Sequence, residues 1–526
     1  MKLWRSGRRR LPMVFFRAAG VCLMAAALVW GQEAETPIFR TGTRLVQVDV
    51  VVHSKKAPVA GLTKDDFEVF DNGKRQAIAV FSVREATAVR AAPVALPAGV
   101  VTNRPVYRGP EPVTATVVLM DSQNTTPEHQ GRARLQALKY LDRAGRRELI
   151  ALYQLGTTLK VLEPFTEDRD ALRSAVDKFK MEQSFNLQDG QGGLLAGIRG
   201  NAANETRKMN FQRQADITTA AFETIARHLQ GLPGRKKLIW ITAGLPLDFQ
   251  QENERNLTTM TEYTNLSKQI YAPMKLMNEA NVAIYPIDPR GVMSPMEGAG
   301  LMDPNLNSMN QLAAMTGGKA FYNDNDLVAG LEEAIADTDL TYTLGFYQPE
   351  DVVDGTMHSL RVDVLRGGAE ARYRKSYTAE GPGKPPAAKF LKATLAGWLR
   401  QPLESTEIQI RAAAVPSKNK LGYYDVVVVV DVAGLKLEEK KDRFAGSIEV
   451  AIVPDSNKTP KGLHQTIQVN LTQDRLRTAL DTGIAVYNQV RVTNDKGKLL
   501  AKGLHLVVMD QATGKTGSVR IPLNGK

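Results

Sequence analysis

The chain has 526 residues, of which 43% are hydrophobic, 24% are charged and 6% are aromatic, and its formal net charge is +12. This composition is typical of a globular protein, and the length exceeds what one hydrophobic core can organise, so two or three domains are expected. The few aromatic residues and the scattered lysines and arginines argue against a nucleic-acid-binding surface.

The first residues predict an export signal. Residues 1–31 hold six of the 68 basic residues and none of the 56 acidic ones, and the uncharged stretch 18–30 is rich in Ala, Leu and Val. A basic segment followed by a short apolar run is typical of a cleaved signal peptide, with an uncleaved anchor as the alternative. Cleavage would lower the net charge to +6 and remove Cys22, the only cysteine, which excludes disulfides and thiolate chemistry in the mature chain. We therefore expect an exported protein, in the periplasm, outside the cell or on its surface, with no membrane span in the mature chain.

The region after the signal predicts a small β module. Strands are expected at 45–52, 67–70 and 78–83, with a turn at Asp71-Asn72-Gly73. Asp65 and Asp66 are expected to cap a turn rather than to act as an acid/base pair. The next segment is rich in Ala, Pro and Val without periodicity, which predicts an extended linker.

From residue 113 onward, predicted strands alternate with predicted helices. The expected strands are 116–120, 149–155, 159–165, 238–241, 282–287 and 320–322. The expected helices are 131–144, 169–180, 211–229, 257–280, 305–316 and 326–337, with a glycine-rich loop at 183–201. Only three residues separate the second and third strands, which forces them to be antiparallel. The pattern predicts one α/β domain with a doubly wound, mainly parallel sheet and one antiparallel edge.

The remaining sequence predicts further β-structure. Strands at 342–347, 360–365 and 371–377 are expected to pair with the N-terminal module, which would make the α/β domain an insertion. Further strands are expected at 424–432, 447–453, 465–470, 483–492, 499–508 and 516–521. They predict a C-terminal β-sandwich, and the five valines 426–430 suggest a strand buried on both faces. The predicted domains are thus a signal peptide (1–31), an N-terminal β module (38–86), a linker (87–112), the α/β domain (113–340), β-strands (341–378), a Pro/Gly linker (379–389) and the C-terminal module (390–526).

The loop after the first core strand is the main candidate site. Asp121, Ser122, Gln123, Asn124 and Thr125 follow an apolar strand directly. At the carboxyl edge of an α/β sheet, such oxygen-bearing side chains suit a cation or a ligand. The same side chains could instead bind backbone N–H groups or cap the next helix, and a metal-free peptide site at this edge is a third alternative.

Catalytic motifs are not found. The six histidines are too scattered for a zinc signature, and His129 is expected to be a surface residue. There is no G-x-S-x-G motif and no phosphate-binding loop. We therefore predict that the chain is not an enzyme.

Several of these features together resemble the von Willebrand factor A domain. They are the DxSxS-like loop, the β-hairpin after the first helix and the T-x-G turn at residues 242–244 that ends the central strand. In addition, four segments look like parts of the VWFA-related proteins of Acidobacteria, namely LTKDDFEV (62–69), GLPGRKK (231–237), IYPIDPRG (284–291) and RYRKSY (372–377). The resemblance covers about residues 38–378 and none of 390–526.

This resemblance implies a Rossmann-type fold and a metal-ion-dependent adhesion site. In that family an Asp and two hydroxyls hold Mg²⁺, a second Asp follows the central strand, and the ion captures an acidic group of a protein partner. Here Asp121 and Thr125 occupy the first and last loop positions, whereas Gln123 replaces the middle hydroxyl and Ala243 replaces the second Asp. The implied site is degenerate.

The sequence thus offers two sets of candidate residues. The ligand-binding candidates are Asp121, Gln123 and Thr125. The candidate ligands for Mg²⁺ are Asp121 and Thr125, with Ser122 and Asp288 as further candidates, although Asp288 could instead shape the Asp-Pro turn.

The sequence thus predicts an exported, non-enzymatic protein-binding protein that acts in adhesion or as a scaffold. An alternative is a structural envelope assembly protein whose domain has lost metal and ligand binding, and a hydrolase with an unrecognised site is a third class. The binding prediction requires that Asp121 faces an open crevice.

Overall fold

The computed structural model describes most of the chain after the predicted signal peptide. The described residues are 45–54, 57–85, 96–104, 115–145, 148–180, 200–245, 269–292, 304–324, 333–335, 340–348, 356–379, 386–455, 462–493 and 501–523. The predicted signal peptide and nearly all of the predicted glycine-rich loop lie outside these residues, as do large parts of the predicted helices 257–280 and 326–337.

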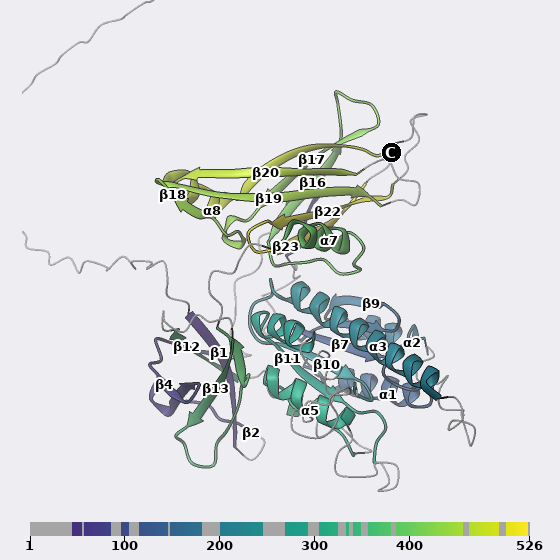
Figure 1. Ribbon diagram of the computed structural model, residues 1–526, viewed down its shortest axis with the longest axis vertical. Coiled ribbons are helices and arrows are strands. Elements are labelled where there is room, and N and C mark those ends of the chain that lie inside the picture. Colours follow the sequence, from purple (N-terminus) through teal and green to yellow (C-terminus); the bar gives the residue numbers. More distant parts are fainter. Residues whose placement is uncertain are drawn as a thin grey trace, which may run out of the picture. The chain divides into compact units, whose positions relative to one another are not determined.

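A five-stranded sheet in the order β11-β10-β7-β8-β9 forms the centre of the α/β unit (Figure 1). Its strands are β7 (Ala115–Asp121), β8 (Leu149–Leu155), β9 (Leu159–Thr166), β10 (Lys236–Ile241) and β11 (Val282–Ile287). The pairs β7–β8, β7–β10 and β10–β11 are parallel, and β9 is antiparallel to β8. The prediction of a mainly parallel sheet with one antiparallel edge is confirmed.

Helices cover both faces of this sheet, which explains why its strands are apolar throughout. The helices are α1 (Pro127–Arg143), α2 (Arg169–Asp177), α3 (Gly200–Leu229), a helix over 269–279 and α5 (Pro304–Thr316). Val117 and Leu119 of β7 pack in a core with α3 and the helix over 269–279. Val118 and Met120 pack in a second core with α1 and α2.

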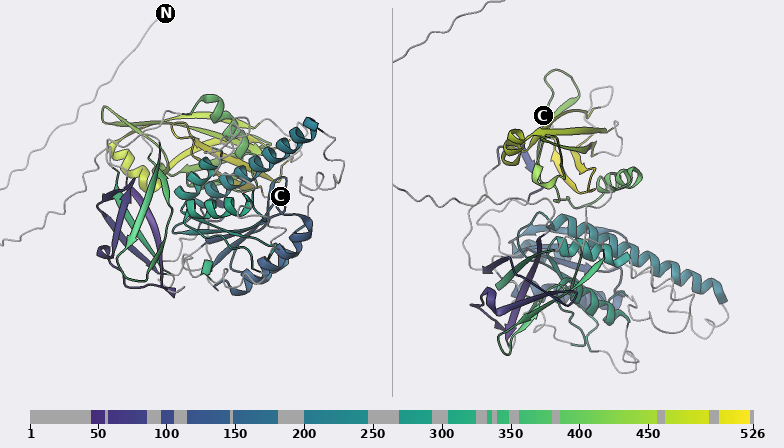
Figure 2. Two further views of the ribbon diagram at one scale, coloured as in Figure 1. Left: turned by 60° about the horizontal axis from the view of Figure 1, so that its bottom comes forward. Right: turned by 60° about the vertical axis from the view of Figure 1, so that its left-hand side comes forward.

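Strands from before and after the α/β unit share two sheets. β1 (Leu45–Ser54) pairs antiparallel with β12 (Leu340–Tyr347), and β13 (Met357–Val364) pairs antiparallel with β3 (Phe67–Asp71). Figure 2 shows the purple and green strands of the two segments side by side. The other strands are β2 (Ala57–Pro58), β4 (Lys74–Gln76), β5 (Val80–Glu85), β14 (Glu370–Arg372) and β15 (Ser376–Thr378). Both sheets contribute to one hydrophobic cluster, so neither segment has to bury a core alone.

The C-terminal module also consists of two sheets around one hydrophobic cluster. One sheet has the order β21-β17-β16-β6, and the other has the order β18-β19-β22-β23 with β20 paired to β19. The strands are β6 (Val100–Thr102), β16 (Ile410–Pro416), β17 (Tyr423–Val430), β18 (Glu438–Lys440), β19 (Arg443–Pro454), β20 (Leu463–Thr472), β21 (Ile484–Arg491), β22 (Gly503–Asp510) and β23 (Thr516–Pro522). The assignment of either β module to the β-sandwich class stays a prediction.

Two sequence-based expectations for this module are corrected. Residues 100–102, predicted to be linker, form β6 and pair with β16. The five valines do not form a strand buried on both faces, because Val426, Val428 and Val430 are buried while Val427 and Val429 are half-buried. The sequence reading also missed the helices α7 (Ala388–Trp398) and α8 (Gln473–Thr482).

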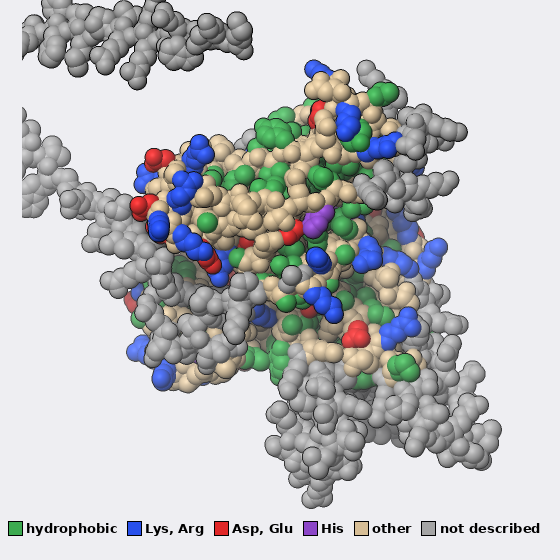
Figure 3. All heavy atoms as spheres, turned by 45° about the horizontal axis from the view of Figure 1, so that its top comes forward, with side chains coloured by type: hydrophobic (Ala, Val, Ile, Leu, Met, Phe, Trp, Pro, Cys, Tyr) green, Lys and Arg blue, Asp and Glu red, His purple; other side chains and the backbone are tan. Residues whose placement is uncertain are grey.

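Two further observations concern the chain's surroundings. Among the described residues, no helix combines the length and the apolarity needed to cross a membrane. On the face that Figure 3 shows, lysine and arginine side chains are dispersed among apolar and neutral ones rather than gathered in one patch.

Candidate functional site

The predicted site loop lies where β7 ends, and it is tied to the neighbouring strand β8. The backbone N–H groups of Ser122 and Gln123 both donate to the carbonyl of Leu155, at 2.8 and 3.0 Å. The Ser122 hydroxyl donates to the same carbonyl at 2.9 Å. These contacts close the loop over the end of β8.

Asp121 is the centre of a buried hydrogen-bond network, with only 1% of its surface exposed. Its Oδ1 accepts from the Asn124 backbone N–H at 2.9 Å. Its Oδ2 accepts from Asn124 Nδ2 at 2.7 Å, Trp240 Nε1 at 2.9 Å and the Thr242 hydroxyl at 3.0 Å. Both carboxylate oxygens are therefore engaged by donors of the chain itself.

The other two predicted ligand-binding residues are also buried. Thr125 is 0% exposed and its hydroxyl accepts from the Ala243 N–H at 3.1 Å, which joins the loop to the end of β10. Gln123 is 2% exposed. The prediction that Asp121 faces an open crevice is therefore corrected, and Gln123 and Thr125 are buried beside it. The physical reason is that a buried carboxylate needs hydrogen-bond donors, and Trp240, Thr242 and Asn124 supply them.

Burial raises the pKa of Asp121, and the hydrogen bonds from Asn124, Trp240 and Thr242 oppose this effect. The sign of the shift shows that lost hydration outweighs the donors.

Mg²⁺ requires several oxygen ligands in near-octahedral geometry. The loop supplies one carboxylate, already bound by four donors, while the Ser122 and Thr125 hydroxyls are used in backbone contacts. Asn124 Oδ1 is buried without a hydrogen-bond partner, but one amide oxygen does not complete a ligand set. The arrangement does not fit a divalent ion. Within the described ranges, no group of three or more His, Cys, Asp or Glu side chains could hold a metal.

Asp288, the further candidate ligand, is engaged locally. It is 0% exposed and accepts from the Arg290 backbone N–H at 2.9 Å. The Arg290 guanidinium binds the same carboxylate at 2.8 to 3.0 Å. Asp288 therefore shapes the turn after β11, as its alternative interpretation predicted.

Sequence reasoning missed Trp240 and Thr218 as members of this network. Trp240 lies 119 residues from Asp121, and Thr218 on α3 accepts from Asn124 Nδ2 at 3.0 Å. The local contact from the Asn124 backbone N–H to Asp121 Oδ1 agrees with the alternative given for this loop, in which its side chains bind backbone N–H groups. The position of Trp240 beside Asp121 is set by the parallel register of β7 and β10.

A second buried polar cluster lies near the opposite, amino end of the parallel strands. Glu148 binds Lys237 Nζ at 2.8 Å and the Tyr140 hydroxyl at 2.7 Å, and it accepts from the Thr116 hydroxyl. Burial by itself would raise the pKa of Glu148, but the Lys237 ammonium and the hydroxyl donors outweigh it and lower that pKa. Through these contacts Glu148, which precedes β8, binds side chains of α1, β7 and β10. The cluster therefore stabilises the packing of these elements.

No protein-family model matches this sequence, and the comparison with curated proteins finds no match. Solved structures with some likeness include an aerotolerance-related membrane protein from Bacteroides fragilis. It is 14% identical, the match covers 42% of this chain and 98% of that chain, and the TM-score is 0.26. Another is proximal thread matrix protein 1 from the mussel byssus, solved with a zinc-occupied MIDAS motif. It is 11% identical, the match covers 45% of this chain and 47% of that chain, and the TM-score is 0.22.

A von Willebrand factor type A protein from Catenulispora acidiphila has 11% identity, coverage of 86% of this chain and 75% of that chain, and a TM-score of 0.23. These TM-scores are too low for the likenesses to carry an argument about function.

Proposed function

We propose that this chain is an exported, non-enzymatic protein-binding protein, acting in adhesion or as a scaffold, and that its α/β unit is of the von Willebrand factor A type found in VWFA-related Acidobacterial proteins. Support comes from the sheet order β11-β10-β7-β8-β9 with its antiparallel hairpin strand, and from the four sequence segments that resemble the family. The unit binds without a metal ion.

The single observation that carries the metal-free proposal is the set of donors around Asp121. Trp240 Nε1, Thr242 Oγ1 and Asn124 occupy the acceptor positions of its carboxylate, and Ala243 offers no second carboxylate. The hydrogen bonds fix the loop against β10 without an ion. Metal-dependent capture of an acidic group at this edge is therefore not part of the proposal.

The proposal is tested by capture and by titration. The mature chain is immobilised and exposed to the envelope fraction of its source cell in Mg²⁺ and, separately, in a chelator. Each retained protein is then purified and titrated against the mature chain. We expect saturable binding of equal affinity in both buffers. Binding that disappears in the chelator would contradict the metal-free proposal, and the absence of any saturable partner would contradict the binding function.

The closed loop also favours a second candidate, a structural envelope assembly protein whose α/β unit has lost metal and ligand binding; association between copies of the chain is the form of assembly that is tested. Sedimentation velocity over a range of concentrations separates the two. Self-association without a heterologous partner supports the assembly protein, whereas a monomer that binds a purified partner supports the first proposal.

A further inference from the structure

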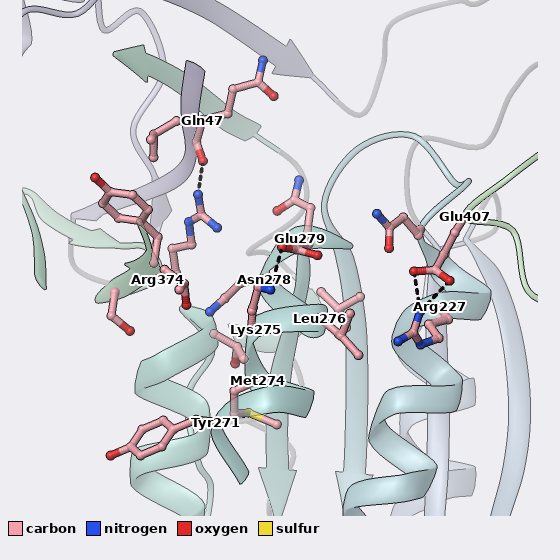
Figure 4. A pocket seen from close by; sticks show the side chains of 18 of the residues that line it. Gln47, Arg227, Tyr271, Met274, Lys275, Leu276, Asn278, Glu279, Arg374 and Glu407 are labelled. Atoms are coloured by element: carbon pink, nitrogen blue, oxygen red, sulfur yellow. Dashed lines mark hydrogen bonds and ion pairs between the residues drawn. The ribbon is translucent and has the colours of Figure 1, made fainter. Parts of the chain in front are cut away.

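A large cavity lies among the two β modules and the α/β unit, away from the loop at Asp121. Its volume is about 1000 Å³, which is the upper end of the range of ligand sites in proteins. Its walls come from β1, the end of α3, the helix over 269–279, the segment 374–378 and the C-terminal module (Figure 4). The cavity is thus large enough for a short peptide segment.

An ion pair forms one side of the cavity, as Figure 4 shows. Arg227 Nη1 at the end of α3 binds both carboxylate oxygens of Glu407, at 2.7 and 2.6 Å. Glu407 also accepts from the Thr516 N–H at 3.0 Å, and its side chain is only 2% exposed. Because its charge is compensated, Glu407 does not repel an anionic ligand.

The remaining charges leave the cavity basic. Six lysine and arginine residues line it against three acidic residues. Besides Glu407, the acidic residues are Glu279, which lies 3.8 Å from Lys275 Nζ, and Asp49. Asp49 accepts from the Thr343 hydroxyl at 2.6 Å and from Asn281 Nδ2 at 2.5 Å. All three acidic groups are already engaged, so the surplus positive charge attracts anions.

Two lysines of the C-terminal module carry part of this surplus. Lys436 and Lys515 both line the cavity and are half-buried. Their backbone N–H groups bind Asp510 and Thr513, but neither ammonium forms an ion pair within the described residues. Half-buried ammonium groups at a concave wall are well placed to meet carboxylates.

The cavity also offers an unused acceptor and adaptable apolar surface. Gln230 Oε1 is buried without a hydrogen-bond partner, which costs free energy that a ligand N–H could recover. Met315 and Met357 line the same cavity, and Met357 is 45% exposed. Methionine side chains adapt to irregular apolar ligands, which is typical of peptide-binding surfaces.

We propose that this cavity binds an acidic peptide segment of a protein partner, with Lys436 and Lys515 contacting its carboxylates, Gln230 accepting a backbone N–H and the methionines contacting apolar side chains. The inference rests on the proposed protein-binding function and gives it a location and a partner chemistry. It also moves the binding site from the closed loop at Asp121 to the junction of the modules.

The test uses phage-displayed random peptides selected on the mature chain, followed by fluorescence anisotropy of the strongest peptide carrying fluorescein. We expect the selected peptides to be rich in Asp and Glu. The double variant Lys436→Glu, Lys515→Glu is expected to bind at least about tenfold more weakly, because two attractive charges become repulsive. The matched control Lys418→Glu, Lys502→Glu changes the net charge equally at exposed positions outside the cavity, and it should bind like the wild type.

Gln230→Leu separates a binding role from a structural one. If Gln230 Oε1 stays without a partner when the peptide binds, Gln230→Leu raises the free energy of unfolding or leaves it unchanged, and the affinity for the peptide does not change. If it accepts a ligand N–H, the variant binds several-fold more weakly while its thermal midpoint does not fall. We expect the second result.

The outcomes distinguish the inference from the function on which it rests. Peptides that bind the wild type and the double charge-reversal variant equally would overturn the cavity site and leave protein binding intact. Selected peptides that are basic or neutral would overturn the acidic chemistry. If no peptide is enriched, the inference is rejected, and the capture experiment with the envelope fraction decides the function independently.

Discussion

At the scale of residues, the hydrogen-bond donors around Asp121 decide whether its carboxylate can bind a cation. A carboxylate on a sheet edge is a ligand for cations only when its oxygens are accessible, and here four hydrogen bonds and nearly complete burial exclude that. Trp240 is the decisive neighbour, since an indole N–H has no other function than donation and needs an acceptor when it is buried. The pair Asp121–Trp240 thus joins β7 to β10.

Asp121→Asn should lower the free energy of unfolding by about 1 to 3 kcal/mol, because the new amide nitrogen faces buried donors that lose their acceptor. Urea denaturation measures the change. The control Asp168→Asn alters an exposed residue that caps α2 by accepting from Asp170 and Ala171, where Asn works as well as Asp. An Asp121→Asn protein as stable as the control would show that the network contributes nothing.

Lys236 is expected to make the free energy of unfolding depend on pH. Burial lowers the pKa of Lys236 to about 7, an effect that Arg84 reinforces and Asp49 opposes, and its Nζ donates to the Leu232 carbonyl at 2.8 Å. Between a folded-state pKa of about 7 and an unfolded-state pKa of about 10.4, the unfolded chain binds a proton that the folded chain does not. The free energy of unfolding should therefore rise with pH in this window, by up to about 1.4 kcal/mol per pH unit from this lysine.

Lys236→Met should remove that slope, whereas the exposed control Lys74→Met should keep it. Urea denaturation at several pH values from neutral to alkaline measures the three slopes. If the wild type and Lys236→Met have parallel profiles, Lys236 remains charged in the folded state.

At the scale of elements, β6 shows how a short strand depends on a distant partner. It has three residues, and it is held on β16 by the ladder and by Asn103, whose side chain donates to Ser405 and Ile408 carbonyls and accepts from the Ile410 N–H. No local periodicity marks such a segment, because three residues cannot display one. The C-terminal module therefore includes a strand that precedes the α/β unit in the chain.

Asn103→Ala should destabilise this module by about 1 to 3 kcal/mol, since three backbone groups lose their partner. Hydrogen exchange at the Ile410 amide should become faster, and urea denaturation should report the loss. Asn419→Ala, at an exposed position of the same module, is the control and should have little effect. Unchanged protection of the Ile410 amide would mean that β6 is not docked in solution.

At the scale of the whole molecule, the end of α3 is completed by the C-terminal module. Thr406 donates its N–H to the Arg227 carbonyl at 3.1 Å and its hydroxyl to the His228 carbonyl at 2.9 Å. The last carbonyls of a helix have no partner within the helix, so Thr406 acts as a cap supplied from another part of the chain. Gly231 donates its N–H to the Thr406 hydroxyl at 2.7 Å, which requires a close approach.

Gly231→Ala should weaken this docking, because the added Cβ would lie 2.7 Å from Thr406 Cβ and 3.0 Å from its carbonyl oxygen. We expect a lower thermal midpoint in calorimetry, with the C-terminal module unfolding separately. Gly131→Ala is the matched control: nothing lies within 4 Å of its added Cβ, and within α1 it should stabilise by about 0.5 to 1 kcal/mol. A single transition at the wild-type temperature for Gly231→Ala would argue against tight docking.

The sequence by itself determined the main strands of the α/β sheet and its mainly parallel character with one antiparallel edge, because apolar periodicity, strand length and the short hairpin turn act between neighbouring residues. The order β11-β10-β7-β8-β9 came from the tertiary structure. The antiparallel β9 follows from three residues between two strands, and the turn at Asp288 follows from its Pro and Arg neighbours. Only the tertiary structure decided that Asp121 is closed, that residues 100–102 belong to the C-terminal sheet, and that one face of β17 is half-buried. Each of these three features depends on which hydrogen-bond donor, strand or core residue from a distant part of the chain lies next to it. The local sequence does not specify such long-range contacts.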